Sequence, residues 1–281
     1  MFLGKVIKYS MSSNELKTFS FYEGNSPLLV SIPHDGRLLS DDINKLFKEK
    51  FIELPDTDWH MNRLYESFKD TQWNIISANF SRYVVDLNRS SDDTKLYKDY
   101  QSTGLCPIKS FSGEHLYSDD NEISELTIKR RVESYWKPYH DKIKQTLESI
   151  KSKYGYAILW DAHSIKSRIP NLFEGELPNL NIGTNSGESC PNSITESIHK
   201  VANDSGFSVV INDRFKGGYI TRHYGKPAEN VFAIQMEIAQ RTYMNELTLS
   251  YDERLSKKLT PILKLMLDTF IVNSAEYFKE R

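Results

Sequence analysis

The chain has 281 residues, of which 39% are apolar and 26% are charged, and its formal net charge is −2. This apolar fraction is too high for a disordered chain, and no run of about 18 uncharged apolar residues predicts a membrane span. The near-zero net charge gives no broad electrostatic reason to bind nucleic acid or an anionic membrane.

Short apolar runs alternate with helical patterns along the chain, and several runs are continuous, as expected for strands buried on both faces. The predicted strands cover 27–33, 73–78, 82–87, 156–161, 207–213 and 230–238. The predicted helices cover 41–49, 57–69, 122–152, 191–205 and 252–278, and Pro138 should kink or divide the third. This alternation predicts an α/β fold with a mixed, mostly parallel sheet flanked by helices.

We expect one α/β domain spanning 1–281, with loop insertions near 89–121 and 164–191, where polar, Gly, Pro and Asn residues gather. Cys106 and Cys190 form no paired spacing, so neither a disulfide framework nor a cysteine-bound structural zinc is predicted. The first residues lack a sustained apolar signal region, which favours a cytoplasmic protein.

Two histidines follow or close predicted strands, where α/β sheets gather their reactive groups. His34 lies in SIPHDG and His163 in LWDAHSI, with Asp161 two residues earlier as a possible brace for the ring. A strand-end histidine held by backbone hydrogen bonds would explain either one alone. The two together favour a pair of zinc ligands.

A hydrolytic zinc keeps three protein ligands and leaves one position for water, so a third ligand is needed. The segment DTDWH offers Asp56 and Asp58, and we choose Asp58. Either carboxylate could instead cap the helix predicted to follow, and spacing does not decide between them.

Glu237 is the odd residue in the apolar run VFAIQMEIA. A carboxylate at the end of a buried run is costly without a partner or a task. We interpret Glu237 as a general base that takes a proton from water and delivers it to a leaving amine. A salt-bridged glutamate on an edge strand is an equally good explanation of the pattern.

The run SRYVVDLNR places Arg82 and Arg89 at the two ends of a predicted strand, with Asn88 beside the second. An arginine fork can hold a substrate carboxylate through two parallel hydrogen bonds. The alternative is an arginine tied to Asp86 or to the following loop.

In FKGGYITRHYG, paired glycines precede Arg222, which suggests a loop that covers an acidic substrate and supplies a cation. An ordinary β-hairpin turn is the other interpretation.

Several long segments, in order along the chain, resemble the N-formylglutamate amidohydrolase (deformylase) family of the histidine-degradation pathway. The resemblance extends over about 25–250 through SIPHDG, DTDWHMNRLY, SRYVVDLNR, TGLCP, YWKPYH, LWDAHSI, IPNLFEGELPNLNIGT, FKGGYITRHYGKP and QMEIAQRTYMNE. The family is similar to zinc carboxypeptidases, aspartoacylase and succinylglutamate desuccinylase. The resemblance therefore implies a zinc-carboxypeptidase-like α/β architecture.

The same resemblance implies roles for individual residues. His34 and His163 match the metal histidines, Glu237 matches the catalytic carboxylate, and Asn88 with Arg89 match the carboxylate-binding Asn-Arg pair. These roles stay implied by the resemblance at this point.

One departure concerns the acidic ligand, because the relatives use a His-x-x-Glu pair. Here Arg37 stands three positions after His34, so the carboxylate ligand must come from elsewhere. Asp58 is our inference, with Asp56 and Asp35 as alternatives.

The resemblance implies zinc-dependent hydrolysis of N-formyl-L-glutamate to L-glutamate and formate, with iron or cobalt as other possible metals. The partner is then a small molecule with carboxylates, and neither nucleic acid nor a membrane is expected. Alternatives are an amidohydrolase for another N-acyl acidic amino acid and a non-catalytic protein that binds acidic metabolites.

Overall fold

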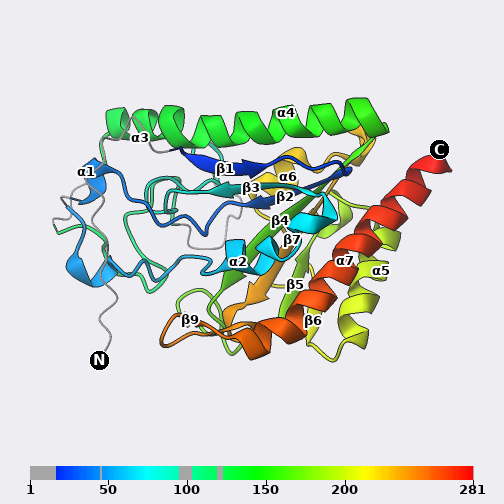
Figure 1. Cartoon of the computed structure of the whole chain (residues 1–281). Coiled ribbons are helices and arrows are strands. Elements are labelled where there is room, and N and C mark those ends of the chain that lie inside the picture. Colours follow the sequence, from blue (N-terminus) through cyan, green and yellow to red (C-terminus); the bar gives the residue numbers. More distant parts are fainter. Residues whose placement is uncertain (1–16, 45, 95–102, 119–122, 281) are drawn as a thin grey trace.

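The computed structural model describes residues 17–44, 46–94, 103–118 and 123–280, and seven strands of these residues form one sheet (Figure 1). The strands are β1 (Phe19–Tyr22), β2 (Leu28–Ile32), β3 (Asn74–Ala78), β4 (Ala157–Ile165), β5 (Leu180–Gly183), β6 (Val209–Ile211) and β7 (Val231–Ala239). Their order is β1-β3-β2-β4-β7-β5-β6, and β3, β2, β4 and β7 run parallel. The strands β1 and β5 pair antiparallel with their inner neighbours, so the predicted mixed, mostly parallel sheet is confirmed.

Helices cover both faces of the sheet. One face carries α3 (Glu125–Arg131), the π-helical turn η3 (Val132–Trp136), α4 (Lys137–Tyr154) and α6 (Tyr219–Tyr224); the other carries α2 (Met61–Glu66), α5 (Asn192–Asp204) and α7 (Glu253–Lys279). The short elements are α1 (Asp41–Asn44), η1 (Glu49–Phe51), η2 (Lys69–Thr71), η4 (Asn185–Gly187), η5 (Pro227–Glu229), η6 (Gln240–Thr242) and the hairpin β8 (Met244–Asn245) with β9 (Ser250–Tyr251).

The long amphipathic helices hold these layers together. On α4, Tyr139, Ile143 and Leu147 bury their side chains against apolar residues of the central strands. On the other face, α7 buries Leu263 and Phe270, and the carboxylate of Asp252 caps its first turn. Burial of apolar area on both faces explains why the central strands read as continuous apolar runs.

Several predicted elements differ from the structure. Residues 82–87 form turns rather than a strand, because ion pairs and the bond from Asp86 N to Leu105 O satisfy this segment without a strand partner. The irregular stretch 164–191 contains β5. The helix predicted over 41–49 ends at Asn44, and the one predicted over 57–69 starts at Met61.

The central strands bring distant residues together at their carboxyl ends. Pro33 and His34 directly follow β2. His163 of β4 and Glu237 of β7 are register partners and lie side by side on the same face of the sheet. Successive strand side chains alternate between faces, so the same face also carries Asp161 and Gln235. This edge of the sheet is the carboxyl edge at which α/β folds bind ligands.

Candidate active site

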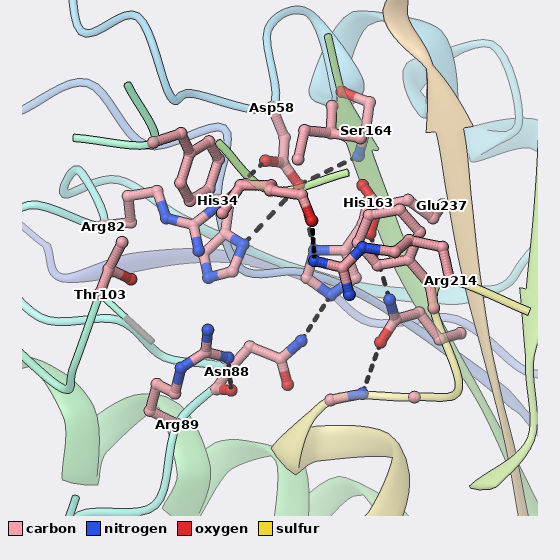
Figure 2. Close-up of a pocket in the computed structure, with 17 residues that line it drawn as sticks. His34, Asp58, Arg82, Asn88, Arg89, Thr103, His163, Ser164, Arg214 and Glu237 are labelled. Atoms are coloured by element: carbon pink, nitrogen blue, oxygen red, sulfur yellow. Dashed lines mark hydrogen bonds and ion pairs between the residues drawn. The ribbon is translucent and has the colours of Figure 1, made fainter. Parts of the chain in front are cut away.

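Three buried side chains meet at the carboxyl edge of the sheet. His34, Asp58 and His163 each offer one ligand atom, and these atoms all lie within 4.8 Å of one another (Figure 2). His34 follows β2, His163 lies in β4, and Asp58 comes from the loop before α2. Two imidazoles and one carboxylate in such proximity are a donor set suited to zinc.

The far side of each imidazole ring is held by a polar partner. His34 Nε2 donates to Asp86 Oδ1 at 2.7 Å, and His163 Nε2 lies 3.0 Å from Asn88 Nδ2 and 3.2 Å from Asp161 Oδ1. Metal-binding histidines are commonly oriented by such second partners. Asp161 Oδ1 has no hydrogen-bond partner among the described residues, so Asp161 acts on His163 through its charge, and Asn88 supplies the hydrogen bond.

The near side of each ring faces Asp58. His163 Nδ1 donates to Asp58 Oδ2 at 3.0 Å, whereas His34 Nδ1 lies 3.7 Å from the same oxygen and has no hydrogen-bond partner among the described residues. A buried ring nitrogen without a partner is costly unless a ligand satisfies it. A cation between the three groups would satisfy it.

The charges in this cluster are strongly coupled. Burial alone would raise the pKa of Asp58, but hydrogen bonds and charges from His163 and His34 outweigh burial and lower this pKa. Burial alone would lower the pKa of His163, but Asp161 and Asp58 hold it well above its ordinary value. The cluster thus places positive and negative groups together among side chains that are almost fully buried.

Asp56 and Asp35, the alternatives to Asp58 as the acidic metal ligand, form hydrogen bonds outside the cluster. Asp56 Oδ2 accepts from Phe111 N at 2.7 Å, and Asp35 accepts from the backbone N–H groups of His60 and Asn62 at the start of α2. Neither belongs to the three-residue cluster. The helix-capping role that we considered for Asp56 or Asp58 falls to Asp35.

Glu237 lies beside the cluster and is 6% exposed. Burial raises the pKa of Glu237 to about 8, and its Oε2 accepts a hydrogen bond from Gln235 Nε2 at 3.1 Å. Among the described residues no lysine or arginine forms an ion pair with it, contrary to the salt-bridged alternative. A carboxyl group with a pKa near neutrality can both accept and deliver a proton.

The residues predicted to bind substrate carboxylates have different surroundings. Arg82 is buried, and its Nη2 donates to Asp86 Oδ2 at 2.6 Å, the pairing that we considered as the alternative role. Arg89 lines the cavity, and its Nη1 donates a hydrogen bond to the carbonyl of Asn88 at 3.1 Å. Asn88 also lines the cavity and accepts through Oδ1 from Ile220 N at 2.8 Å.

Arg222 does not line this cavity; its Nε donates to the carbonyl of Gly217 at 2.7 Å. The Gly-Gly pair directly precedes α6, so the alternative interpretation as a β-hairpin turn is wrong. Gly218 is required there, because a Cβ at this position would lie 2.3 Å from Asn88 Nδ2. Gly218 N also donates to Gln235 Oε1 at 2.6 Å, so this loop reaches the Glu237 side of the site.

Sequence reasoning missed Arg214, whose guanidinium lines the cavity and donates through Nη2 to the carbonyl of Leu172. Its one signal is a position just before the Gly-Gly pair. Thr103 and Phe111 were also missed, and the ring of Phe111 lies under Arg82 with 4.7 Å between its centroid and Cζ. Both come from loops far from the strands, which local patterns do not place.

The cavity that these groups surround has a volume of about 130 Å³. Its lining combines the cluster and Glu237 with cations and one apolar wall: His34, Asp58, Arg82, Asn88, Arg89, Thr103, Phe111, His163, Ser164, Ile165, Leu172, Arg214, Phe215, Gly217, Gly218, Gln235 and Glu237. This size and charge suit a small anionic molecule rather than a polymer. Over the described residues, no helix is both long and apolar enough to cross a lipid bilayer.

The fold and the cavity together define an α/β protein with a His-Asp-His cluster and a buried carboxyl group at the carboxyl edge of its sheet. A family model matches residues 26–244, and the chain belongs to the N-formylglutamate amidohydrolase family. The family resemblance predicted from the sequence is thus confirmed.

Similar proteins support this assignment over nearly the whole chain. An N-formylglutamate deformylase of Pseudomonas putida is 43% identical over 265 residues, which are 94% of this chain and 99% of that protein. One of Pseudomonas aeruginosa is 41% identical over 264 residues, with 93% and 99% covered.

Solved structures share the fold. The N-formylglutamate amidohydrolase of Ralstonia eutropha JMP134 aligns with a TM-score of 0.78 at 22% identity, covering 94% of this chain and 99% of that one. A gene product of Agrobacterium tumefaciens aligns with a TM-score of 0.70 at 14% identity, covering 92% and 98%.

Proposed function

We propose that the protein hydrolyses N-formyl-L-glutamate to L-glutamate and formate. The observation that carries this proposal is the buried cluster of His34, Asp58 and His163 with Glu237 beside it, in a cavity that also holds arginines. Relatives at 41–43% identity over nearly their full length are N-formylglutamate deformylases, which supports the same substrate.

We propose one zinc ion as the cofactor, held by His34, Asp58 and His163. The unpartnered Nδ1 of His34 and the mixed nitrogen and oxygen donors support this fit. Bound there, zinc would polarise the formyl carbonyl and make water a better nucleophile at neutral pH. Other divalent metals that accept the same donors are tested alongside zinc.

Glu237 is proposed to move the proton. It takes a proton from the water molecule as the water oxygen forms a bond to the formyl carbon. When the bond between this carbon and the amide nitrogen breaks, Glu237 gives the proton to the departing nitrogen of glutamate. The burial that raises the pKa of Glu237 to about 8 supports both roles at neutral pH.

The cations are proposed to bind the two substrate carboxylates. Arg89 and Arg214 line the cavity on separate loops, so they can hold carboxylates at the two ends of the substrate. Arg82 contributes positive potential, and Asn88 orients the substrate. Arg222 acts on binding indirectly, through its bond to the carbonyl of Gly217. Holding both carboxylates orients the amide and selects against uncharged amides.

We further propose that the chain works as one domain in the cytoplasm. Both loop insertions, near 89–121 and 164–191, contribute cavity residues, among them Phe111 and Leu172. Cys106 and Cys190 are free thiols, which suits a reducing compartment.

The direct experiment measures formate and glutamate release from N-formyl-L-glutamate by purified protein. The protein is assayed as isolated, after chelation, and after addition of zinc, cobalt or iron, with the metal content determined each time. We expect activity that is lost on chelation and restored by metal. No formate release at any metal content would contradict the proposal.

The same assay separates the alternatives. A higher kcat/KM for acetyl- or succinyl-glutamate than for formyl-glutamate would indicate another N-acyl acidic amino acid as the substrate. Glutamate binding without hydrolysis of any of these amides would indicate a non-catalytic binding protein.

A further inference from the structure

The segment 135–140, YWKPYH, has no part in the reaction proposed above, yet it lies on the face of the sheet that also carries His163 and Glu237. It includes the end of the π-helical turn Val132–Trp136, which Lys137 separates from Pro138. Proline cannot donate a helical hydrogen bond, and its ring crowds the carbonyl four residues earlier. The π turn accommodates this proline and directs the rings of Trp136 and His140 to the same place, and π turns of this kind often occur at functional sites.

These two rings hold the backbone on either side of Asn88. Trp136 Nε1 donates to the carbonyl of Arg89 at 2.9 Å, and His140 Nε2 donates to the carbonyl of Leu87 at 2.9 Å. The rings stack with 3.8 Å between centroids and 24° between planes, so the two donors are fixed relative to each other. Both carbonyls adjoin residues that line the cavity.

A second element completes this support. The hydroxyl oxygen of Tyr224 in α6 lies 2.9 Å from His140 Nδ1 and 3.2 Å from the carbonyl oxygen of His140, and the two rings are parallel within 14°. Ile220 of the same helix donates its N–H to Asn88 Oδ1. The residues 87–89 are therefore held between α4 and α6.

We infer that Trp136 and His140 are positioning residues that set the direction of the Arg89 guanidinium toward a substrate carboxylate. This inference rests on the proposed function, because it assigns Arg89 to a carboxylate. Neither Trp136 nor His140 lines the cavity, so both act through the backbone of 87–89. Arg89 bonds the carbonyl of Asn88, and its orientation therefore follows this backbone.

The central test is Trp136→Phe, which keeps an aromatic ring and removes the donor to Arg89. We expect the KM for N-formyl-L-glutamate to rise roughly five- to tenfold, because one hydrogen bond that positions a cation is lost. The value of kcat should stay within about twofold, because the reacting groups lie on the strands. Metal content and thermal unfolding are measured on the same samples.

A pair of variants at His140 adds a rescue. His140→Phe removes the donor to Leu87 and should raise KM as Trp136→Phe does, whereas His140→Gln keeps a donor at similar reach and should restore most of the affinity. Tyr154→Phe is the control, because it removes a hydroxyl bond from the same helix α4, to Asn25, far from 87–89.

A wild-type KM in Trp136→Phe and His140→Phe would overturn the inference, as would equal effects of Gln and Phe at His140. If these variants do not fold, Tyr224→Phe decides: a raised KM supports the inference and an unchanged KM overturns it.

A calorimetric Kd for L-glutamate is the second readout, and it does not depend on catalysis. Wild-type protein that binds glutamate but releases no formate would contradict the proposed function alone. Equal glutamate affinity in wild type and Trp136→Phe would contradict the positioning role.

Discussion

The cavity has two halves that are built in different ways. The strand half carries His34 after β2, His163 in β4 and Glu237 in β7, and the sheet register fixes the last two side by side. The loop half carries Arg89 and Arg214, which are placed by side-chain bonds to backbone carbonyls. The strand half is fixed by the ladder between β4 and β7, whereas the loop half depends on individual hydrogen bonds, among them those of Trp136 and His140 to the backbone of 87–89.

This difference separates chemistry from recognition. Groups that move protons or hold a metal need positions accurate to a fraction of an ångström, which the strand ladder supplies for His163 and Glu237 and the hydrogen bond to His163 supplies for Asp58. Groups that recognise carboxylates can sit on loops, where substitutions change the substrate with little effect on the sheet. Changes in the strand half should therefore lower kcat, and changes in the loop half should raise KM.

The largest expected effect is in the strand half, in Glu237→Gln. This variant should lower kcat by on the order of 10³-fold, because the amide cannot carry the proton from water to the leaving nitrogen. The metal should stay bound, since Glu237 is not one of the three clustered groups. Steady-state formate release and metal analysis check both statements.

The control is Glu188→Gln, which changes an exposed carboxylate and should leave kcat unaltered. A near-normal kcat in Glu237→Gln would show that another group is the base. Loss of the metal from this variant would make Glu237 a ligand.

The second prediction compares two neighbouring aspartates. Asp58→Asn should weaken metal binding by at least about a hundredfold, because changes even to partners of metal ligands have effects approaching this size. Asp56→Asn should keep the metal, because Asp56 holds the backbone of Phe111 instead. Competition with a chromophoric chelator measures both affinities, and equal metal loss in the two variants would contradict the assignment of Asp58.

The third prediction concerns the loop half. Arg89→Ala and Arg214→Ala should each raise the KM for N-formyl-L-glutamate roughly ten- to hundredfold, because each variant loses a charge-assisted hydrogen bond to a substrate carboxylate. The value of kcat should change less than KM in both. Arg130→Ala, an exposed cation of α3 outside the cavity, is the control. A fall of kcat alone in Arg214→Ala would place this arginine on the reacting carbonyl.

The strand half was largely predictable from sequence because its signals are local. Glu237 interrupts a continuous apolar run, and His163 closes another, so each is conspicuous within a few residues of chain. The central strands were predicted close to their true positions for the same reason.

The loop half was less predictable because its contacts are long-range. Residues 82–87 alternate like a strand, yet Asp86 is buried by its pairing with Arg82 and with His34, 52 positions away. Arg214 and Arg222 both flank the Gly-Gly pair, and only the fold shows which of them lines the cavity. Spacing along the chain contains no information on such choices.

The last prediction concerns His140, which supports the loop half, and the dependence of the free energy of unfolding on pH. Burial lowers the pKa of His140 to about 3, and the charge of His223 acts in the same direction, while the bond to Leu87 opposes it. Below an ordinary histidine pKa of about 6.5, the unfolded chain therefore takes up a proton that the folded chain refuses. The contribution of His140 to the free energy of unfolding is present in full above this pH and is lost as the pH falls toward 3.

Comparison of wild type with His140→Gln isolates the contribution of His140 to the free energy of unfolding, because glutamine does not titrate. The difference in free energy of unfolding, wild type minus variant, should fall by about 1.4 kcal/mol per pH unit between roughly pH 6 and 4. Urea unfolding of metal-free protein measures it, with Tyr154→Phe as a variant that keeps His140 and should parallel wild type. A pH-independent difference would mean that His140 is protonated in the folded protein. Its Nδ1 would then donate to the hydroxyl oxygen of Tyr224, and the hydroxyl hydrogen would go to the carbonyl of His140, 3.2 Å away.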